Sequence, residues 1–246
     1  MPALSHVAST RAVPSPGRRG LWMVLMLSLA ACATAAPTPK ALPPAPMDAV
    51  LADAVGPEGY LGAVAMVAER GTVVYRGVFG HADLQGRHPL REDAIFRLYS
   101  MSKPVTSVAA LMLAEEGGLQ LDAPVADYLP AFAGLQRVAG GSVEAPELVP
   151  VQRVLTVRHL LTHTAGFATG GDDIRVASAL LQAEAPEDAT DLAGYAQRVA
   201  RAPLATEPGT RFRYDGVNTE VLARVVEVAS GQPFDVFLRT RIFRPL

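Results

Sequence analysis

The chain has 246 residues, a formal net charge of −2 and a hydrophobic content of 50%. This length accommodates one large domain, or two small ones, with a substantial core. No block or stripe of basic residues is present, which excludes nucleic-acid binding as the main function. The single cysteine excludes an internal disulfide framework.

The first 32 residues are typical of an export signal. Basic residues precede LWMVLMLSLAA, an apolar run of 11 residues, whereas a membrane-spanning helix needs about 20. The run ends in Leu29-Ala30-Ala31-Cys32, which resembles a bacterial lipobox and would make Cys32 the lipidated first residue of the mature protein. Two alternatives remain: ordinary cleavage near ATAAP, and twin-arginine export through Arg18-Arg19.

Residues 33–46, ATAAPTPKALPPAP, are rich in proline and alanine and predict an extended tether. The folded domain is therefore expected over residues 47–246. Its first element is a short helix over residues 47–55. Two apolar runs, residues 61–69 and 72–80, flank a short glycine-containing turn and predict a hairpin. The polar stretch 81–93 then predicts a loop.

The strongest helical pattern runs from residue 100 to 117, with Pro104 in the first turn, where a missing N–H is tolerated. Residues 130–154 predict a loop with extended pieces. Five further helices are expected, over residues 156–164, 172–183, 191–202, 217–230 and 233 to about 243. Thr156 is the cap candidate of the first, and Thr190 or Asp191 caps the third. Gly231 ends the fourth. Strands come first and helices follow, which indicates an α/β fold whose sheet needs further strands.

The stretch YSMSKPVTSVAALML, residues 99–113, contains an unusual lysine. Of the 22 basic residues, only Lys40 and Lys103 are lysines. A lysine, unlike an arginine, can give up its proton in a protein, and residues three apart on a helix lie on one side. Ser100 and Lys103 are therefore candidates for a nucleophile and its base, at a helix start whose free N–H groups favour an oxyanion. The alternative is a capping serine and a solvated lysine.

Three segments carry a resemblance to a known family. FRLYSMSKPVTSVAALMLAEEGGLQLDAPVADYLP, VLTVRHLLTHTAGF and GTRFRYDGVNTEVLARVVEVASGQPF occur in this order along the chain. They resemble the serine β-lactamase and penicillin-binding-protein superfamily, in particular its class C-like and esterase-like branch. The resemblance implies a β-lactamase/transpeptidase-like αβα sandwich with a helical subdomain.

The resemblance also implies roles for single residues. Ser100 would be the acylated nucleophile, Lys103 its proton partner, and Tyr214 would assist proton transfer as a phenolate or through Lys103. The family motif is Tyr-x-Asn or Tyr-Ser-x, whereas this chain has Tyr214-Asp215-Gly216. Asn218 is then the candidate substitute for a substrate-binding amide. The change is easier to reconcile with ester hydrolysis than with tight β-lactam or peptide recognition.

In related proteins the domain continues past the position that matches residues 241–246. The resemblance implies that further helices, the central strands and a third motif of the type Lys/His-x-Gly would follow there. That strand supplies the second N–H of the oxyanion hole, and losing one such donor typically costs on the order of a hundred- to a thousand-fold in rate. We therefore expect this chain to hold the N-terminal part of the domain, with the C-terminal strands missing.

The sequence thus predicts a serine hydrolase of the cell envelope, lipid-anchored on the periplasmic side, with the outer membrane as a candidate location. Its partners would be a small-molecule acyl substrate (an ester, amide or β-lactam-like donor) and the membrane; we expect a monomer that needs no cofactor. Two other hypotheses are a non-catalytic, truncated or degenerate homologue that binds muropeptide or a partner, and a general lipoprotein with an accidental S-x-x-K.

His159 and His163 lie four apart, but no third zinc ligand is evident, and His163 is expected to fix the loop that follows it. His81 and His88 are expected to be solvated.

Overall fold

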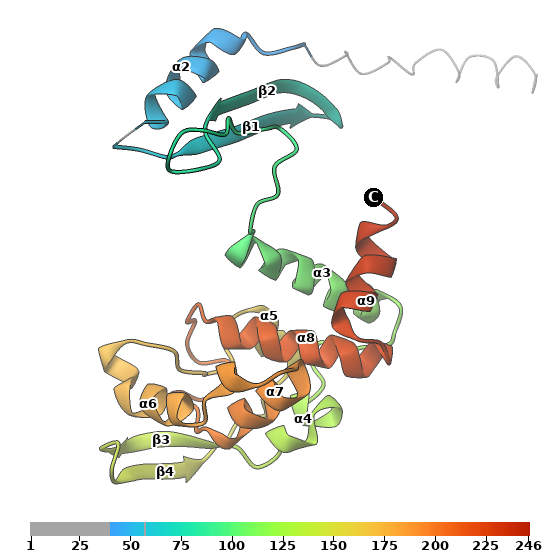
Figure 1. Ribbon diagram of the computed structural model, residues 1–246. Helices are drawn as coiled ribbons and strands as arrows, with labels where there is room; N and C mark the ends of the chain where they lie inside the picture. The colour runs from blue at the N-terminus through green and yellow to red at the C-terminus, as the bar shows by residue number, and fades with distance from the viewer. Residues whose placement is uncertain (1–39, 57) are drawn as a thin grey trace, which may run out of the picture. The chain divides into compact units, whose positions relative to one another are not determined.

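The computed structural model describes residues 40–56 and 58–246 (Figure 1). The chain divides into two compact units, residues 1–96 and residues 97–246, which we describe separately. The predicted export signal, with Cys32, lies outside the described residues, as does the first half of the predicted tether, residues 33–39. Among the helices that the structure describes, none is both long and apolar enough to cross a membrane.

The first unit begins with helix α2, Pro44–Ala54, three residues before the predicted start of the folded domain. The end of the predicted tether is therefore helical and not extended. Proline lacks the N–H that the first turn of a helix leaves unpaired, so prolines at positions 44 and 46 are compatible with a helix start. The chain is already paired just before this helix, because the Leu42 N–H donates to the carbonyl of Val74 at 3.0 Å.

The predicted hairpin is confirmed as β1, Gly62–Glu69, paired antiparallel with β2, Thr72–Gly80. Its two turn residues, Arg70 and Gly71, have φ angles of 49° and 78°. Positive φ at both central residues is the geometry of a type I′ turn, whose twist matches that of the strands it joins. The loop that follows contains His81 and His88, both exposed, and His88 pairs with Asp83.

The second unit carries most of the helices. They are α3, Ser102–Glu115; α4, Val125–Tyr128; α5, Val157–Leu161; α6, Arg175–Ala183; α7, Leu192–Arg201; α8, Gly216–Ser230; and α9, Phe234–Leu238, which continues into a π-helical turn, Arg239–Phe243. Three predicted helix ends agree with the structure. Thr156 directly precedes α5, and the Asp191 carboxylate caps α7 by accepting the Gly194 N–H at 2.7 Å. Gly231 ends α8 with a φ angle of 68°.

The predicted loop between residues 130 and 154 contains a second hairpin. Strands β3, Gln136–Gly141, and β4, Pro146–Pro150, pair antiparallel, with an irregularity between Val138 and Gly140. Their high glycine and proline content hid the strand pattern in the sequence. The strands of the described residues form two two-stranded sheets, β1–β2 and β3–β4, in agreement with the expectation that this chain holds only part of the sheet.

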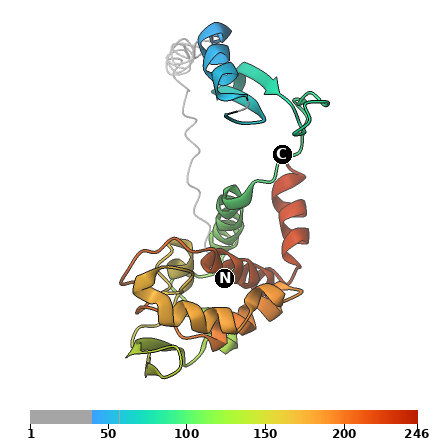
Figure 2. The same cartoon turned by 60° about the vertical axis from the view of Figure 1, so that its left-hand side comes forward.

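The core of the second unit is centred on α8. Val221, Val225 and Val226 are fully buried on this helix, and Ala109 and Ala110 are fully buried on α3. Figures 1 and 2 both show α3 beside α8, in agreement with their direct packing. The small alanine side chains allow a close approach of the two helices. This packing brings the start of α3 near the start of α8.

Candidate active site

Ser100 lies in a single 3₁₀ turn, Tyr99–Met101, directly before α3. Its side chain is exposed, and Lys103 is half-buried in the first turn of the helix. The Lys103 Nζ donates to the Ser100 Oγ at 3.3 Å. The geometry therefore places the two predicted residues in direct contact, as their spacing of three predicts.

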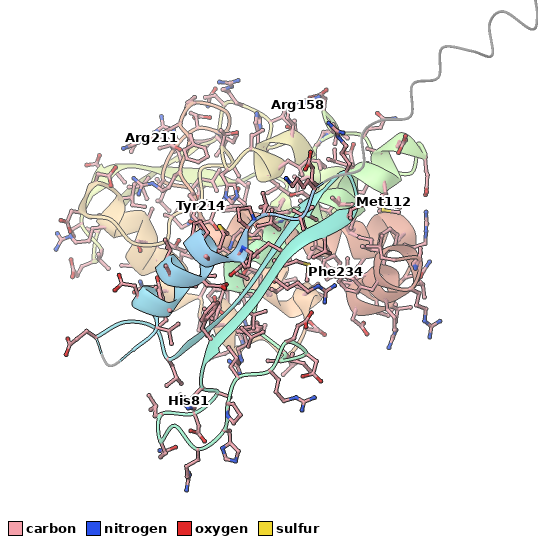
Figure 3. All side chains as sticks on the ribbon, turned by 90° about the horizontal axis from the view of Figure 1, so that it is seen from above. His81, Met112, Arg158, Arg211, Tyr214 and Phe234 are labelled. Atoms are coloured by element: carbon pink, nitrogen blue, oxygen red, sulfur yellow. The ribbon has the colours of Figure 1, made fainter. Side chains whose placement is uncertain are left out.

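Tyr214, labelled in Figure 3, joins these two residues from the segment before α8. The Lys103 Nζ lies 5.1 Å from the centre of the Tyr214 ring. A hydrogen bond with Ser100 lowers the pKa of the Tyr214 phenol, and the hydrogen bond and positive charge of Lys103 lower this pKa further. The structure thus gathers Ser100, Lys103 and Tyr214 at one point, and these contacts make the Tyr214 phenol more acidic than an ordinary one.

The ring of His163 lies against the ring of Tyr214, and this contact was not predicted from the sequence. The two ring centres are 4.8 Å apart with an interplanar angle of 31°. The Asp215 N–H donates to the His163 Nδ1 at 3.2 Å, and the Arg213 N–H donates to the His163 carbonyl at 2.9 Å. The histidine therefore bonds to a segment distant in sequence, in addition to any role in its own loop. Its neighbour His159 accepts the Thr156 N–H on Nδ1 at 3.2 Å.

Asp215 and Asn218 form a buried polar pair at the start of α8. Asp215 accepts the Val217 N–H at 2.9 Å as the helix cap, and the Asn218 amide donates to the Asp215 carbonyl at 3.3 Å. Asn218 is only 1% exposed. The amide lies inside the helix packing and not on the surface beside Ser100, so its substrate-binding role stays a prediction that this placement does not favour.

Position 216 has room for a Cβ atom. A Cβ built on Gly216 would meet the Glu220 carboxylate at 3.4 Å, an ordinary van der Waals contact. Glu220 accepts a hydrogen bond from the Tyr195 hydroxyl at 3.3 Å, and burial raises the pKa of the Glu220 carboxyl. Packing therefore does not require the glycine that replaces the family's asparagine.

The surface around Ser100 carries large apolar side chains from both segments of the site. Tyr99 is 77% exposed, Met101 68% and Leu98 57%. Phe212, which precedes Tyr214, is 66% exposed and contacts His163 edge-on with ring centres 6.3 Å apart. Arg211, labelled in Figure 3, forms an ion pair with Asp173 at 2.8 Å and fixes the start of this segment. The site therefore combines a polar centre with an apolar rim.

Comparison with known proteins gives a family match over most of the chain. The family model described as Beta-lactamase matches residues 47–246. Esterase EstB of Burkholderia gladioli is 37% identical over 205 residues, which cover 81% of this chain and 49% of the relative. Penicillin-binding protein 4 of Amycolatopsis lactamdurans is 34% identical over 161 residues, which cover 63% of this chain and 35% of that protein.

A solved structure gives the same result at the level of the fold. Unliganded simvastatin synthase from Aspergillus terreus matches with a TM-score of 0.67 and 27% identity, over 82% of this chain and 52% of that one. These likenesses confirm the predicted family and the predicted β-lactamase-like α/β fold. The chain spans about half the length, or less, of the relatives it matches.

The lowered pKa of Tyr214 can be tested directly. We expect an ultraviolet difference titration between the protein and its Tyr214→Phe variant to show one phenol that ionises below the ordinary pKa of 10.0. In Lys103→Met this phenol should ionise at higher pH, because the ammonium that stabilises the phenolate is gone. An unchanged titration in Lys103→Met would contradict the contact between the two side chains.

Proposed function

Because the chain belongs to the Beta-lactamase family, we propose that it is the part of a serine hydrolase that carries the nucleophile, and that Ser100 forms an acyl-enzyme. The observation that supports this most directly is the 3.3 Å contact between the Lys103 Nζ and the Ser100 Oγ, with Tyr214 beside both. A serine, an adjacent base and a third group that orients the base form the arrangement of covalent catalysis.

In the proposed reaction, the Ser100 Oγ attacks the carbonyl carbon of an acyl substrate, and its proton passes to the Tyr214 phenolate, directly or through Lys103. The tetrahedral intermediate collapses, the bond to the leaving group breaks, and the leaving group takes up that proton. Water then attacks the acyl-enzyme, releases the acid and restores Ser100. The lowered pKa of Tyr214 supports its role in proton transfer, because this phenol loses its proton more easily than an ordinary tyrosine does.

We propose esters as the substrate class, in preference to amides or β-lactams. Gly216 presents no side chain that could hydrogen-bond a substrate amide, although a Cβ atom would fit at this position. The apolar rim of Leu98, Tyr99, Met101 and Phe212 suits an apolar acyl or alcohol group. The relatives named an esterase and a simvastatin synthase are consistent with this choice.

We further propose that the protein acts in the cell envelope as a lipoprotein. The support is the sequence alone: the only cysteine, Cys32, follows the short apolar run at the position that a lipobox requires. A lipid anchor would place the domain at a membrane surface, where esters with apolar groups concentrate. An extended segment after Cys32 would separate the domain from that surface.

The nucleophile can be identified with a fluorophosphonate probe on the protein as its own cell produces it. We expect an adduct on Ser100, no adduct in Ser100→Ala, and labelling slower by about a hundred-fold or more in Lys103→Met, because this variant loses the ammonium that takes part in proton transfer and lowers the pKa of Tyr214. Ser102→Ala, which removes an exposed serine two residues away, is the matched control and should label normally. Slow labelling without turnover of any ester would instead support the non-catalytic homologue.

The substrate preference can be tested at position 216. We expect Gly216→Asn to increase acylation by a penicillin relative to a simple ester by about five- to tenfold, the effect of one neutral hydrogen bond of ~1 kcal/mol. Gly216→Ala, which adds only the Cβ, should leave the ratio unchanged. The ester assignment fails if the unchanged protein acylates with penicillin as fast as with esters.

The anchor can be tested by labelling cells with a radioactive fatty acid. We expect the label on the native protein and its loss in Cys32→Ser, with the variant leaving the membrane fraction. A mature protein that begins near residues 33–37 and carries no lipid would contradict the lipobox and favour ordinary signal cleavage.

A further inference from the structure

We propose that His163 is the positioning residue for Tyr214: its carbonyl, its ring nitrogen and its ring face together hold the phenol beside Ser100 and Lys103. This inference rests on the function proposed above, because the position of Tyr214 affects the reaction only if Tyr214 moves the proton. Each of the three contacts comes from a different part of the histidine.

Two backbone hydrogen bonds attach the residues on either side of Tyr214 to His163. The Arg213 N–H donates to the His163 carbonyl at 2.9 Å, and the Asp215 N–H donates to its Nδ1 at 3.2 Å. Residues 211–215 belong to no helix or strand, so these bonds replace the regular pairing that would otherwise fix the backbone. The Cα of Tyr214 is therefore held from both sides by one residue.

The ring of His163 restricts the remaining freedom of the tyrosine side chain. It lies 4.8 Å from the Tyr214 ring at an angle of 31°, while Lys103 lies 5.1 Å from the same ring. A phenol confined in this way keeps its hydroxyl near Ser100. A displacement of about 1 Å in such a group can cost on the order of a hundred-fold in rate.

The backbone of His163 is strained in a manner that fits a positioning role. Its φ of 54° lies in the left-handed region, which few residues other than glycine adopt, although histidine is found there more often than most. The strain is maintained by bonds on both sides: the His163 N–H donates to the Leu160 carbonyl at 3.3 Å, and the Thr164 N–H to the His159 carbonyl at 2.9 Å. A glycine would relieve the strain but would lose both side-chain contacts with the tyrosine segment.

The contacts also fix the protonation state of the histidine. Because Nδ1 accepts an N–H, the ring must be neutral for the bond to form. The groups that face it are Lys103 of α3, the Asp215 carboxyl at the start of α8, and Tyr214. Burial lowers the pKa of His163 most, and the charge of Lys103 lowers it further, while the contacts with the Asp215 backbone and carboxylate raise it. The neutral form therefore persists below the ordinary histidine pKa, and strong acidification would break the bond to Asp215.

Two substitutions separate the contacts. His163→Asn keeps an acceptor oxygen near the position of Nδ1 and tolerates positive φ, but it loses the ring. His163→Phe keeps a ring and loses the acceptor. His159→Asn is the matched control, because His159 also accepts a backbone N–H on Nδ1 but bonds to Thr156 and not to the tyrosine segment.

The first measurement is the ultraviolet titration of the Tyr214 phenol, which does not depend on catalysis. We expect His163→Phe to raise the phenol pKa towards its ordinary value of 10.0, because the hydroxyl is no longer held beside Lys103. His163→Asn should raise it less, and His159→Asn should not raise it. If His163→Phe does not fold, as judged by circular dichroism, the phenol pKa values of His163→Asn and His159→Asn are compared instead to decide whether His163 positions Tyr214.

The second measurement separates binding from chemistry in the labelling of Ser100. We expect His163→Phe to reduce the maximal acylation rate by on the order of a hundred-fold and to leave the concentration for half-maximal rate nearly unchanged. The proposal is overturned if the phenol pKa is unchanged in the histidine 163 variants, or if His159→Asn shifts it equally. Failure of the unchanged protein to acylate at all would overturn the proposed function, while the titration would still decide whether His163 positions Tyr214.

Discussion

The close packing of α3 against α8 is the constraint on which the candidate site depends. Fully buried alanines on α3 face a helix whose valines at 221, 225 and 226 are equally buried. Lys103 lies in the first turn of one helix, and Tyr214 lies just before the other. Because both helices are anchored in the same core, their starts cannot move apart without exposing apolar surface. The contact between Lys103 and Tyr214 is therefore a consequence of the packing of the two helices.

The local part of the site could be predicted from the sequence, because the helical repeat alone places Ser100 and Lys103 on one side. The contribution of Tyr214 could not be derived in this way; it came from the resemblance to a family, since periodicity does not show how distant helices pack. The extended pieces predicted within residues 130–154 are present, but their pairing as the β3–β4 hairpin was not predicted, for a related reason. Its strands contain glycine and proline, residues that propensity assigns to loops, and only their pairing in three dimensions identifies them.

The role of His163 illustrates what a sequence pattern does not contain. The spacing of His159 and His163 in HLLTH is compatible with metal binding. In the structure the Nδ1 atom of each histidine accepts a backbone N–H instead. The positive φ of His163 could not be predicted from its residue type alone, because histidine adopts such angles more often than most residues but still only in a minority of positions. Nearby, the Asp215 Oδ2 and the Asn218 Oδ1 are buried without a hydrogen-bond partner in the part of the chain that the structure describes.

The account depends on Ser100 being a nucleophile, and one measurement tests this most directly. A membrane fraction of the native cell would be treated with a fluorophosphonate or penicillin probe, the protein isolated, and its peptides analysed by mass spectrometry. The account predicts that the probe is found on Ser100, in the peptide that also contains Tyr99 and Met101. A folded, fully recovered protein whose Ser100 peptide carries no probe would contradict it, and membership of the family would then describe fold and ancestry alone.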